Sequence, residues 1–334
     1  MLDTRWACPP FDIVRAAHAE LLVTDLERAR EFYVDLLGFV VTEEDAGALY
    51  LRGYEERLHH SLVLRRAREP AVGHLAFRVA DEADLEHLAA FFRSEGCPVR
   101  WLEAGEEPGQ GRALRVQDPL GFPVEFFHAM EPAERLLQRF DRYVGAHIMR
   151  IDHFNLHVPD VQSAYDYYKR LGFRCSEYTA TDPPDERLWA AWMYRKPNVH
   201  DVALMNGAGP RLHHVGFWVG DTHSVLRACD ILAAANRADV IERGPGRHGL
   251  SNAFFVYLRD PDGHRIELYT SDYYTGDPDF EPIRWSVNDP RRGTFWGHAA
   301  PVSWFEESSR VASLEGGLMD LRPALLNQRP QTVT

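Results

Sequence analysis

Hydrophobic and polar residues alternate along several short stretches of the chain, and each of these stretches is followed by a segment with helical spacing. Segments near 15–68 and 150–206 both open with an alternating strand around a histidine. Each strand leads into a helix-forming stretch, VTDLERAREFYVDLLGF or VPDVQSAYDYYKRLGF, in which an aspartate precedes the apolar residues and a glycine ends the helix. The pattern predicts a strand, a helix and further strands in both segments.

Two further segments, near 72–129 and 212–271, repeat this arrangement with a different ending. A strand that carries a histidine comes first, a helical stretch follows, and a hairpin containing DPLG or DPDG closes the segment. Each of the four segments is thus predicted to be a β-α-β-β-β module, which cannot bury its sheet face alone. The predicted fold class is α+β, with the four modules paired into two incomplete-barrel domains.

The repeats also predict domain boundaries. We expect an N-terminal two-module domain over residues 1–135, a linker over 136–149 and a C-terminal two-module domain over 150–271. The linker lies in the stretch EPAERLLQRFDRYVGAHIM, whose first part is expected to be helical. Residues 272–334 form an extension rich in Pro, Trp and Arg, which we expect to cover the site or to make subunit contacts.

Composition and charge exclude several classes of partner. The 334 residues are 45% hydrophobic, which is ample for real cores, and the net charge of −13 argues against nucleic acid or an anionic membrane as a partner. The chain has no basic start followed by an apolar stretch, and no run reaches the roughly 18 apolar residues of a spanning helix, so a cytoplasmic location is expected. The four cysteines are far apart with no CxxC, which predicts reduced thiols.

The most informative chemistry is a set of three metal-capable residues that occurs twice, in similar local settings and with similar spacing. The two copies are His18, His74 and Glu125, and His153, His214 and Glu267. Two histidines and one carboxylate on one face of a metal leave three adjacent coordination positions open, which is the arrangement that non-haem Fe(II) uses to hold substrate and O₂ together. The leading interpretation is therefore an O₂-using metalloenzyme.

Alternation along a strand predicts which residues share a face with each ligand of the second copy. In IDHFNLHV, the face that carries His153 is predicted to hold also Ile151, Asn155 and His157. The opposite face is predicted to hold Phe154, Leu156 and Val158. Asn155 is thus expected beside the His153 ligand.

The same rule applies to the other two ligands. Glu267 is predicted to share a face with Arg265 and Tyr269, opposite two aliphatic residues that belong in the core. His213 and His214 are neighbours on a strand and are predicted to face opposite ways, so at most one of them can be a ligand. The repeat match to His74 selects His214.

At this point the sequence resembles the vicinal oxygen chelate superfamily and, within it, the type I extradiol catechol dioxygenases. The stretches that carry the resemblance are RIDHFN, AAWMYRKPNVHD, RLHHV, VIERGPGRHGLSNAF and IELYTSDYYTGDPD. The GPGRHG loop and the DYYTGDPD segment are the most specific of these, because the superfamily fold alone hosts many reactions. The resemblance is strongest to the branch that inserts both atoms of O₂ into 3,4-dihydroxyphenylacetate (homoprotocatechuate), giving 5-carboxymethyl-2-hydroxymuconate semialdehyde.

The resemblance implies roles for particular residues. It implies a metal, Fe(II) with Mn(II) as an alternative, on His153, His214 and Glu267. It implies a catalytic group made of His200, Tyr257 and Asn155. It implies a substrate-binding group made of Trp192, Arg243, His248 and Arg292. The spacing around NDPRRGTFWG differs by one from the family pattern, so that Arg291 stays open as an alternative to Arg292. A small catechol and O₂ are the implied partners, and a homotetramer is the implied assembly.

The first copy of the ligand set is expected to be vestigial, because its surroundings differ from those of the second. Arg115 stands at the position that matches Tyr257, and Glu20 stands at the position that matches Asn155. No GPGRHG-like loop appears in this half, although His60 does match His200. We therefore expect the N-terminal domain to be non-catalytic, and whether it binds a metal is left open.

Three other functions fit parts of the sequence. The first is an O₂ enzyme on the same scaffold that acts on another catechol or on a 4-hydroxyphenylpyruvate-type substrate. The second is a protein that only binds or sequesters a ligand. The third is a glyoxalase-like isomerase with Zn²⁺ or Ni²⁺, which needs no O₂. The match of His200 and Tyr257 together with the GPGRHG loop favours catechol cleavage.

Overall fold

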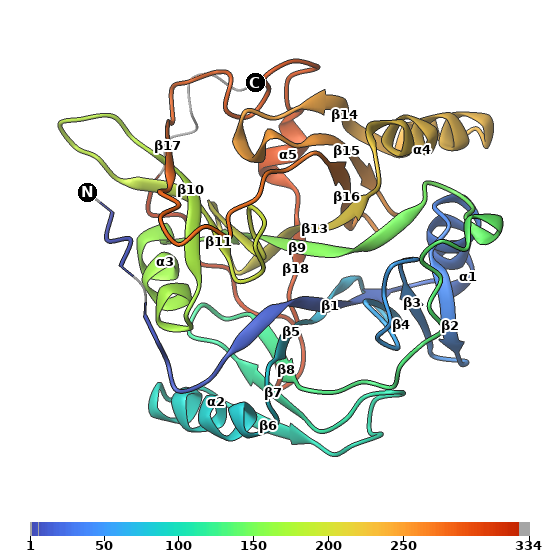
Figure 1. The fold of residues 1–334 in the computed structure, drawn as a ribbon, viewed down its shortest axis with the longest axis horizontal. Coiled ribbons are helices and arrows are strands. Elements are labelled where there is room, and N and C mark those ends of the chain that lie inside the picture. The colour runs from blue at the N-terminus through green and yellow to red at the C-terminus, as the bar shows by residue number, and fades with distance from the viewer. Residues whose placement is uncertain (1, 6, 327–334) are drawn as a thin grey trace.

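The computed structural model describes residues 2–5 and 7–326, and it contains the four predicted modules, each with an α-helix between its first and second strand (Figure 1). The first module consists of β1 (Ile13–Val23), α1 (Leu26–Arg30) with a π-helical continuation (Glu31–Leu36), β2 (Val40–Glu44), β3 (Ala48–Arg52) and β4 (Leu62–Arg66). The second consists of β5 (Ala71–Val79), α2 (Ala83–Ser94), β6 (Val99–Leu102), β7 (Ala113–Gln117) and β8 (Pro123–Phe127).

The C-terminal half repeats this order and adds an extension. The third module consists of β9 (Ile148–Val158), α3 (Val161–Arg170), β10 (Arg174–Ala180), β11 (Leu188–Tyr194) and β12 (Val202–Asn206). The fourth consists of β13 (Arg211–Val219), α4 (Thr222–Ala234), β14 (Ile241–Arg247), β15 (Phe254–Arg259) and β16 (Arg265–Thr270), with short 3₁₀ turns at Ala238–Val240 and Leu250–Asn252. The extension contributes β17 (Ile283–Ser286), α5 (Val302–Glu306) and β18 (Ser309–Arg310), and residues 327–334 of the predicted extension lie outside the described part.

The residues that predicted the helix ends form capping interactions in the structure. The side chain of Asp25 accepts hydrogen bonds from the first free N–H groups of α1, and Asp160 and Asp221 do the same for α3 and α4. Gly38 and Gly172 follow the helices with φ of 84° and 88°, a conformation that glycine adopts without steric cost. These caps and stops explain why both helix-forming stretches begin and end where the sequence predicts.

Within the described residues the strands form two open sheets. The first has eight strands in the order β2-β3-β4-β1-β5-β8-β7-β6, and the second has ten, with the order β14-β15-β16-β13-β9-β12-β11-β10-β17 and β18 beside β13. In each sheet the first strands of the two modules pair antiparallel at the centre, β1 with β5 and β9 with β13. The α+β class and the paired, incomplete barrels are thus confirmed.

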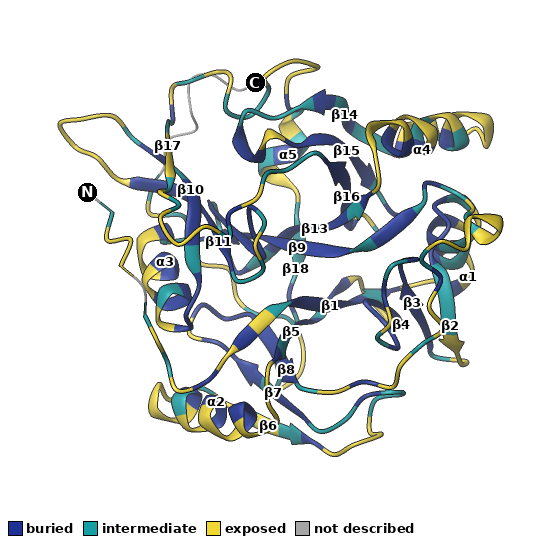
Figure 2. Ribbon diagram, viewed as in Figure 1, coloured by how far each residue is buried: buried dark blue, intermediate teal, exposed yellow. Residues whose placement is uncertain are grey.

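The two sheets bury a shared apolar core between them. Phe77 of β5 contacts Phe154 of β9 with ring centroids 5.7 Å apart, and Phe39 contacts Phe217 at 4.8 Å. Buried residues concentrate in the central strands, whereas α2 and α4 expose one side to solvent (Figure 2). The opposite face of each sheet lines the concave inside of its own incomplete barrel, which we call the cup. No helix in the described residues is long and apolar enough to cross a membrane.

The expectation of a helical linker is wrong. Residues 131–147 contain only one 3₁₀ turn, Phe140–Arg142, and the rest follows the surface of the first module. Val144 N–H donates to the Tyr54 hydroxyl at 2.8 Å, and Ala146 N–H donates to the Leu37 carbonyl at 2.9 Å. The linker's backbone groups therefore find partners in the first module rather than within a helix.

Candidate metal and substrate site

Three donor atoms converge on the inner face of the C-terminal sheet. His153 on β9, His214 on β13 and Glu267 on β16 come from adjacent strands and are buried. The two Nε2 atoms are 3.1 Å apart, and Glu267 Oε2 lies 3.0 Å from His153 Nε2 and 3.1 Å from His214 Nε2. Neighbouring ligands of an octahedral ion lie about 3 Å apart when bonds are about 2.1 Å long, so this donor set fits Fe(II) or Mn(II).

Each histidine has a different partner behind it. The Asp152 carboxylate accepts from His153 Nδ1 at 3.1 Å. Burial lowers the pKa of His153, but its hydrogen bonds with Asp152 and Glu267 outweigh burial and raise this pKa to about 9. A carboxylate behind a histidine fixes the ring and makes its free nitrogen a better metal ligand.

Behind His214 the partner is a second imidazole. His213 Nε2 donates to the Trp304 carbonyl at 2.9 Å, because a carbonyl can only accept. A neutral His213 must then accept at Nδ1, which lies 2.7 Å from His214 Nδ1. Burial lowers the pKa of His214 to about 4 and holds the pKa of His213 well below its usual range, so both rings are neutral at pH 7. This chain of hydrogen bonds leaves the lone pair of His214 Nε2 facing the donor triangle.

Two face assignments made from alternation are wrong. His213 and His214 do not point to opposite sides, since a register irregularity between Leu212 and His214 brings their rings into contact. A second irregularity between Ile151 and His153 turns Ile151 into the apolar core with Phe154. Bulges interrupt the period of two and re-aim side chains. His214, and not His213, belongs to the donor triangle, and Glu267 lies opposite the core residues Ile266 and Leu268 as predicted.

One cavity contains all ten residues that the sequence assigned to the metal, to catalysis or to substrate. They are His153, His214, Glu267, His200, Tyr257, Asn155, Trp192, Arg243, His248 and Arg292. The cavity is also lined by residues that the sequence analysis missed, chiefly Trp189, Leu250, Trp304 and Phe305. Trp304 and Phe305 belong to α5, so the extension contributes two aromatic residues to the lining of this cavity. The apolar pair in the SWFE segment was the only available signal for this contribution.

On one side of the triangle lie His200 and Asn155. The His200 ring is buried, and its centroid is 4.0 Å from that of His153. Burial and the neighbouring His153 hold the pKa of His200 well below its usual range, so its ring is neutral at pH 7. His200 Nδ1 and Asn155 Oδ1 have no hydrogen-bond partner among the described residues. Both side chains can therefore hydrogen-bond a bound molecule.

On the other side lie Tyr257 and His248. The Gly293 carbonyl accepts from His248 Nδ1, which makes His248 Nε2 the acceptor of the Tyr257 hydroxyl at 2.9 Å. Burial lowers the pKa of His248 to about 3, and burial together with Glu267 raises the pKa of Tyr257 well above its usual value. The hydrogen of the Tyr257 hydroxyl is thus directed at His248 Nε2, which leaves the tyrosine oxygen able to accept a hydrogen bond from a bound molecule.

Two arginines face the same cavity beneath the extension. Arg243 lies over the Trp304 ring at 4.5 Å and donates to the Thr294 hydroxyl at 2.7 Å. Arg292 lies over the Trp189 ring at 5.0 Å. Burial lowers the pKa of each guanidinium to about 10, which shows how costly their charge is in this setting. Arg291, in contrast, is exposed and pairs with Asp289 at 2.8 Å.

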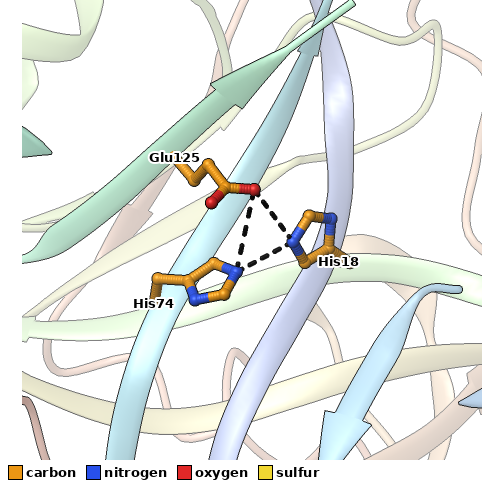
Figure 3. Close-up of side chains that lie close together, drawn as sticks. All are labelled: His18, His74 and Glu125. Carbon is orange, nitrogen blue, oxygen red and sulfur yellow. Dashed lines mark hydrogen bonds and ion pairs between the residues drawn. The ribbon is translucent and has the colours of Figure 1, made fainter. Parts of the chain in front are cut away.

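The first ligand set also converges, on the inner face of the N-terminal sheet. His18 on β1, His74 on β5 and Glu125 on β8 are buried, and their donor atoms face one another (Figure 3). Arg115 and Glu20 lie against this cluster, where the C-terminal site has Tyr257 and Asn155. The sequence thus identified both clusters, and they differ in the residues around them.

Known proteins share both the sequence pattern and the fold of this chain. The family model "Glyoxalase/Bleomycin resistance protein/Dioxygenase superfamily" matches residues 15–126 and 150–268. A structure of a homoprotocatechuate 2,3-dioxygenase variant from Brevibacterium fuscum is 45% identical with a TM-score of 0.94, covering 99% of this chain and 92% of that chain. The anaerobic complex of that enzyme with 3,4-dihydroxyphenylacetate is 46% identical with a TM-score of 0.92, covering 96% of this chain and 100% of that chain.

Relatives with other names are also similar over most of their length. A manganese-dependent 2,3-dihydroxybiphenyl 1,2-dioxygenase from Geobacillus genomosp. 3 is 33% identical, over 85% of this chain and 94% of the relative. A metapyrocatechase from Geobacillus stearothermophilus is 31% identical, over 92% of this chain and 97% of the relative. The chain therefore belongs to the Glyoxalase/Bleomycin resistance protein/Dioxygenase superfamily. Within that superfamily it is a metal-dependent extradiol ring-cleaving dioxygenase.

Proposed function

We propose that this dioxygenase cleaves 3,4-dihydroxyphenylacetate, with both atoms of O₂ entering 5-carboxymethyl-2-hydroxymuconate semialdehyde. The observation that carries the proposal is the pair of arginines, Arg243 and Arg292, in the buried cavity that also holds the donor triangle. A guanidinium can hold a carboxylate through two parallel hydrogen bonds. Because burial lowers the pKa of both arginines, a substrate carboxylate would relieve an existing electrostatic penalty.

In this proposal His153, His214 and Glu267 hold the metal. An ion held there would supply open coordination positions for a catechol and O₂ and the redox capacity that lets the two react. One negative ligand and two neutral imidazoles favour a deprotonated catechol, since its charge then balances that of the ion. Both oxygen atoms end in the product, and the reaction therefore needs no external reductant.

Proton handling is assigned to neutral side chains on either side of the triangle. Tyr257 and His248 form a hydrogen-bonded pair in which the tyrosine oxygen can accept a hydrogen bond from one substrate hydroxyl. His200 is neutral and can accept a proton and later return it when the O–O bond breaks, with a contribution of roughly 10²–10⁴ in rate. Asn155 lies on the same side and can donate to a bound oxygen.

The shape of the cavity orders the substrate. Trp192 and Trp189 offer flat apolar faces for the aromatic ring, and both are buried in the cavity wall. The arginines lie on the side of the extension, where Trp304 covers the cup. A catechol with a carboxymethyl group can thus lie with its hydroxyls towards the donor triangle and its carboxylate towards Arg292.

The proposal is tested by aerobic incubation of Fe(II)-loaded protein with 3,4-dihydroxyphenylacetate. We expect a yellow ring-cleavage product and one O₂ consumed per catechol. Parallel assays with catechol, 4-methylcatechol and 2,3-dihydroxybiphenyl measure preference, and kcat/KM for the carboxylated substrate should be at least about tenfold higher than for the others, a difference of about 1.4 kcal/mol. Faster cleavage of an uncharged catechol would contradict the substrate assignment and leave the dioxygenase class intact.

A further inference from the structure

The N-terminal cluster has the same layout of donor atoms as the C-terminal triangle. His18 Nε2 lies 2.9 Å from His74 Nε2 and 3.3 Å from Glu125 Oε1, and His74 Nε2 lies 3.8 Å from the same oxygen (Figure 3). These spacings lie around the values of about 3.0 Å and about 3.4 Å between neighbouring ligands of octahedral and tetrahedral ions with bonds of about 2.1 Å. The three side chains are 0–1% exposed. The cluster therefore has the donors and the spacing of a metal site.

The surrounding protein does not provide hydrogen-bond partners for all the polar atoms of this buried cluster. The two Nε2 atoms face each other, so that only one of them can donate and only one lone pair is used. His18 Nδ1 has no hydrogen-bond partner among the described residues, and His74 Nδ1 has only the Glu20 carboxylate near it, at 3.6 Å, which is too long for a hydrogen bond. Buried polar atoms normally have partners, and two such rings aimed at one carboxylate are unusual. A divalent cation in the triangle would use the lone pairs of all three donors at once.

The surroundings of Glu125 support a ligand role rather than opposing it. Arg115 donates to Glu125 Oε2 from Nε at 2.9 Å and from Nη2 at 2.6 Å, and Gln110 donates to Oε1 at 2.8 Å. These bonds hold the carboxylate so that Oε1 faces the two histidines. Carboxylates that bind metals are commonly held by such outer hydrogen bonds.

The charge of the cluster is balanced by a paired exchange of residues. Arg115 faces Glu125 across β7 and β8 just as Tyr257 faces Glu267 across β15 and β16, which adds one positive charge. Glu20 faces His74 just as Asn155 faces His214, which adds one negative charge. The positive charge of Arg115 and the negative charge of Glu20 cancel, and Arg65 and Glu107, which form a further ion pair beside them, cancel as well. The exchange at these two positions therefore adds no net charge around the N-terminal triangle.

We propose that His18, His74 and Glu125 bind a second divalent transition-metal ion, of the class of Mn²⁺, Fe²⁺ or Zn²⁺, in a site that is structural. A donor set of two imidazole nitrogens and one carboxylate oxygen suits these ions. The site does not take part in ring cleavage, since charged Arg115 and Glu20 stand where the C-terminal cavity has the neutral Tyr257 and Asn155. Its contribution is to tie β1, β5 and β8 together at the centre of the N-terminal sheet.

The experiment counts bound metal in four forms of the full chain. Metal-free protein is reconstituted with Mn²⁺, and in a parallel series with Zn²⁺, passed over a chelating resin to remove loose ions, and measured by mass spectrometry of the metal. The wild type should hold two ions per chain, Glu125→Gln one, Glu267→Gln one, and the double variant none. Glu125→Gln should keep the turnover of the wild type when both are assayed with iron at the C-terminal site.

Control variants distinguish metal binding at this cluster from nonspecific metal binding and from unfolding of the variant. His18→Asn is a second variant of the same site, and His87→Asn replaces an exposed histidine on α2 and should keep two ions. Circular dichroism checks that each variant is folded. In Glu267→Gln, addition of metal should raise the melting temperature, and this shift should vanish when Glu125→Gln is added.

One ion per chain in the wild type, for both metals, would overturn the proposal. A second ion that persists in folded Glu125→Gln and His18→Asn would also overturn it, because that ion would bind elsewhere. Neither result bears on ring cleavage, which depends on the C-terminal triangle, so the failure of this proposal is distinguishable from the failure of the proposed function.

Discussion

The carboxylate of Asp201, in the loop before β12, accepts the backbone N–H of Ala16 on β1 of the other sheet, with 2.8 Å between Oδ1 and N. The same buried carboxylate accepts from the Lys196 ammonium at 2.9 Å. Lys196 also donates to the His200 carbonyl at 2.8 Å and to the Asp152 carbonyl at 2.6 Å. The segment that carries His200 is therefore fastened to β1 of the N-terminal half, which gives that half a structural role in the C-terminal site.

Replacing Asp201 by Asn should loosen this segment. The variant keeps the shape of the side chain but leaves the largely buried Lys196 without its closest anionic partner, which should lower the free energy of unfolding by about 3 kcal/mol. Turnover should fall roughly tenfold, because a small displacement of a catalytic group is costly. Urea unfolding and O₂ uptake measure the two effects. The exposed Asp185→Asn should change neither, and identical behaviour of the two variants would contradict the role of Asp201.

Asp152→Asn should weaken metal binding at the C-terminal site. The carboxylate behind His153 both orients the ring and strengthens its free nitrogen as a donor, and loss of such a partner typically costs 10- to 100-fold in metal affinity. The measurement is a titration with Mn²⁺ against a competing chelator, in a Glu125→Gln background so that only this site is counted. Asp272→Asn removes a neighbouring carboxylate that does not contact the His153 ring and serves as the control. An unchanged affinity in Asp152→Asn would refute the assignment.

His200→Phe should separate binding from oxygen chemistry. The three metal donors are untouched, and metal content and anaerobic catechol binding should therefore stay within about twofold, whereas O₂ consumption should slow by roughly 10²–10⁴. A stopped-flow measurement follows both steps. His60→Phe, the same exchange at the matching position of the N-terminal half, should leave turnover unchanged. Wild-type rate and product in His200→Phe would remove this histidine from the mechanism.

Arg292→Leu should mainly affect carboxylated catechols. The loss of one partner of a buried charge pair costs at least about 2 kcal/mol, so kcat/KM for 3,4-dihydroxyphenylacetate should fall by about 30-fold or more. The value for 4-methylcatechol should change little. Arg291→Leu is the matched control, since this neighbouring arginine is exposed and pairs with Asp289. Equal losses for both substrates would show that Arg292 does not bind the carboxylate.

Stability should depend on pH through Asp118 in the DPLG turn. Burial raises the pKa of this carboxyl from 3.8 to about 7, although the N–H groups of Phe122 and Leu120 donate to Oδ1. A raised pKa in the folded state means that the contribution is fully present below about pH 4 and is lost as the pH rises through about 7. The total is about 4 kcal/mol.

The test compares the wild type with Asp118→Asn by urea unfolding between pH 4 and pH 8. The variant keeps an oxygen that can accept from the backbone but does not ionise. The free energy of unfolding of the wild type, relative to that of the variant, should fall by about 4 kcal/mol across this range. Parallel curves for the two proteins would contradict the raised pKa.

Much of the C-terminal site was predictable from the sequence because its positions repeat. Each ligand occupies the same place in its module, and the identity of the strands follows from local alternation and turn residues. The repeat selects His214 over His213, and the three residues of this ligand set line one cavity with the seven that the resemblance implied. The resemblance to the extradiol dioxygenases supplied His200, Tyr257 and the arginines, which alternation alone does not distinguish from ordinary strand and loop residues.

By itself the sequence determined the four modules, their helix caps and stops, and the two ligand sets, since these depend on interactions between residues close in the chain. Only the tertiary structure decided the bulges at Ile151 and His213, the extended path of the linker, and the bond between Asp201 and Ala16. The physical reason is that packing between distant segments selects a bulge or a hydrogen bond between the two halves. The alternation of apolar and polar residues along a strand does not depend on that packing.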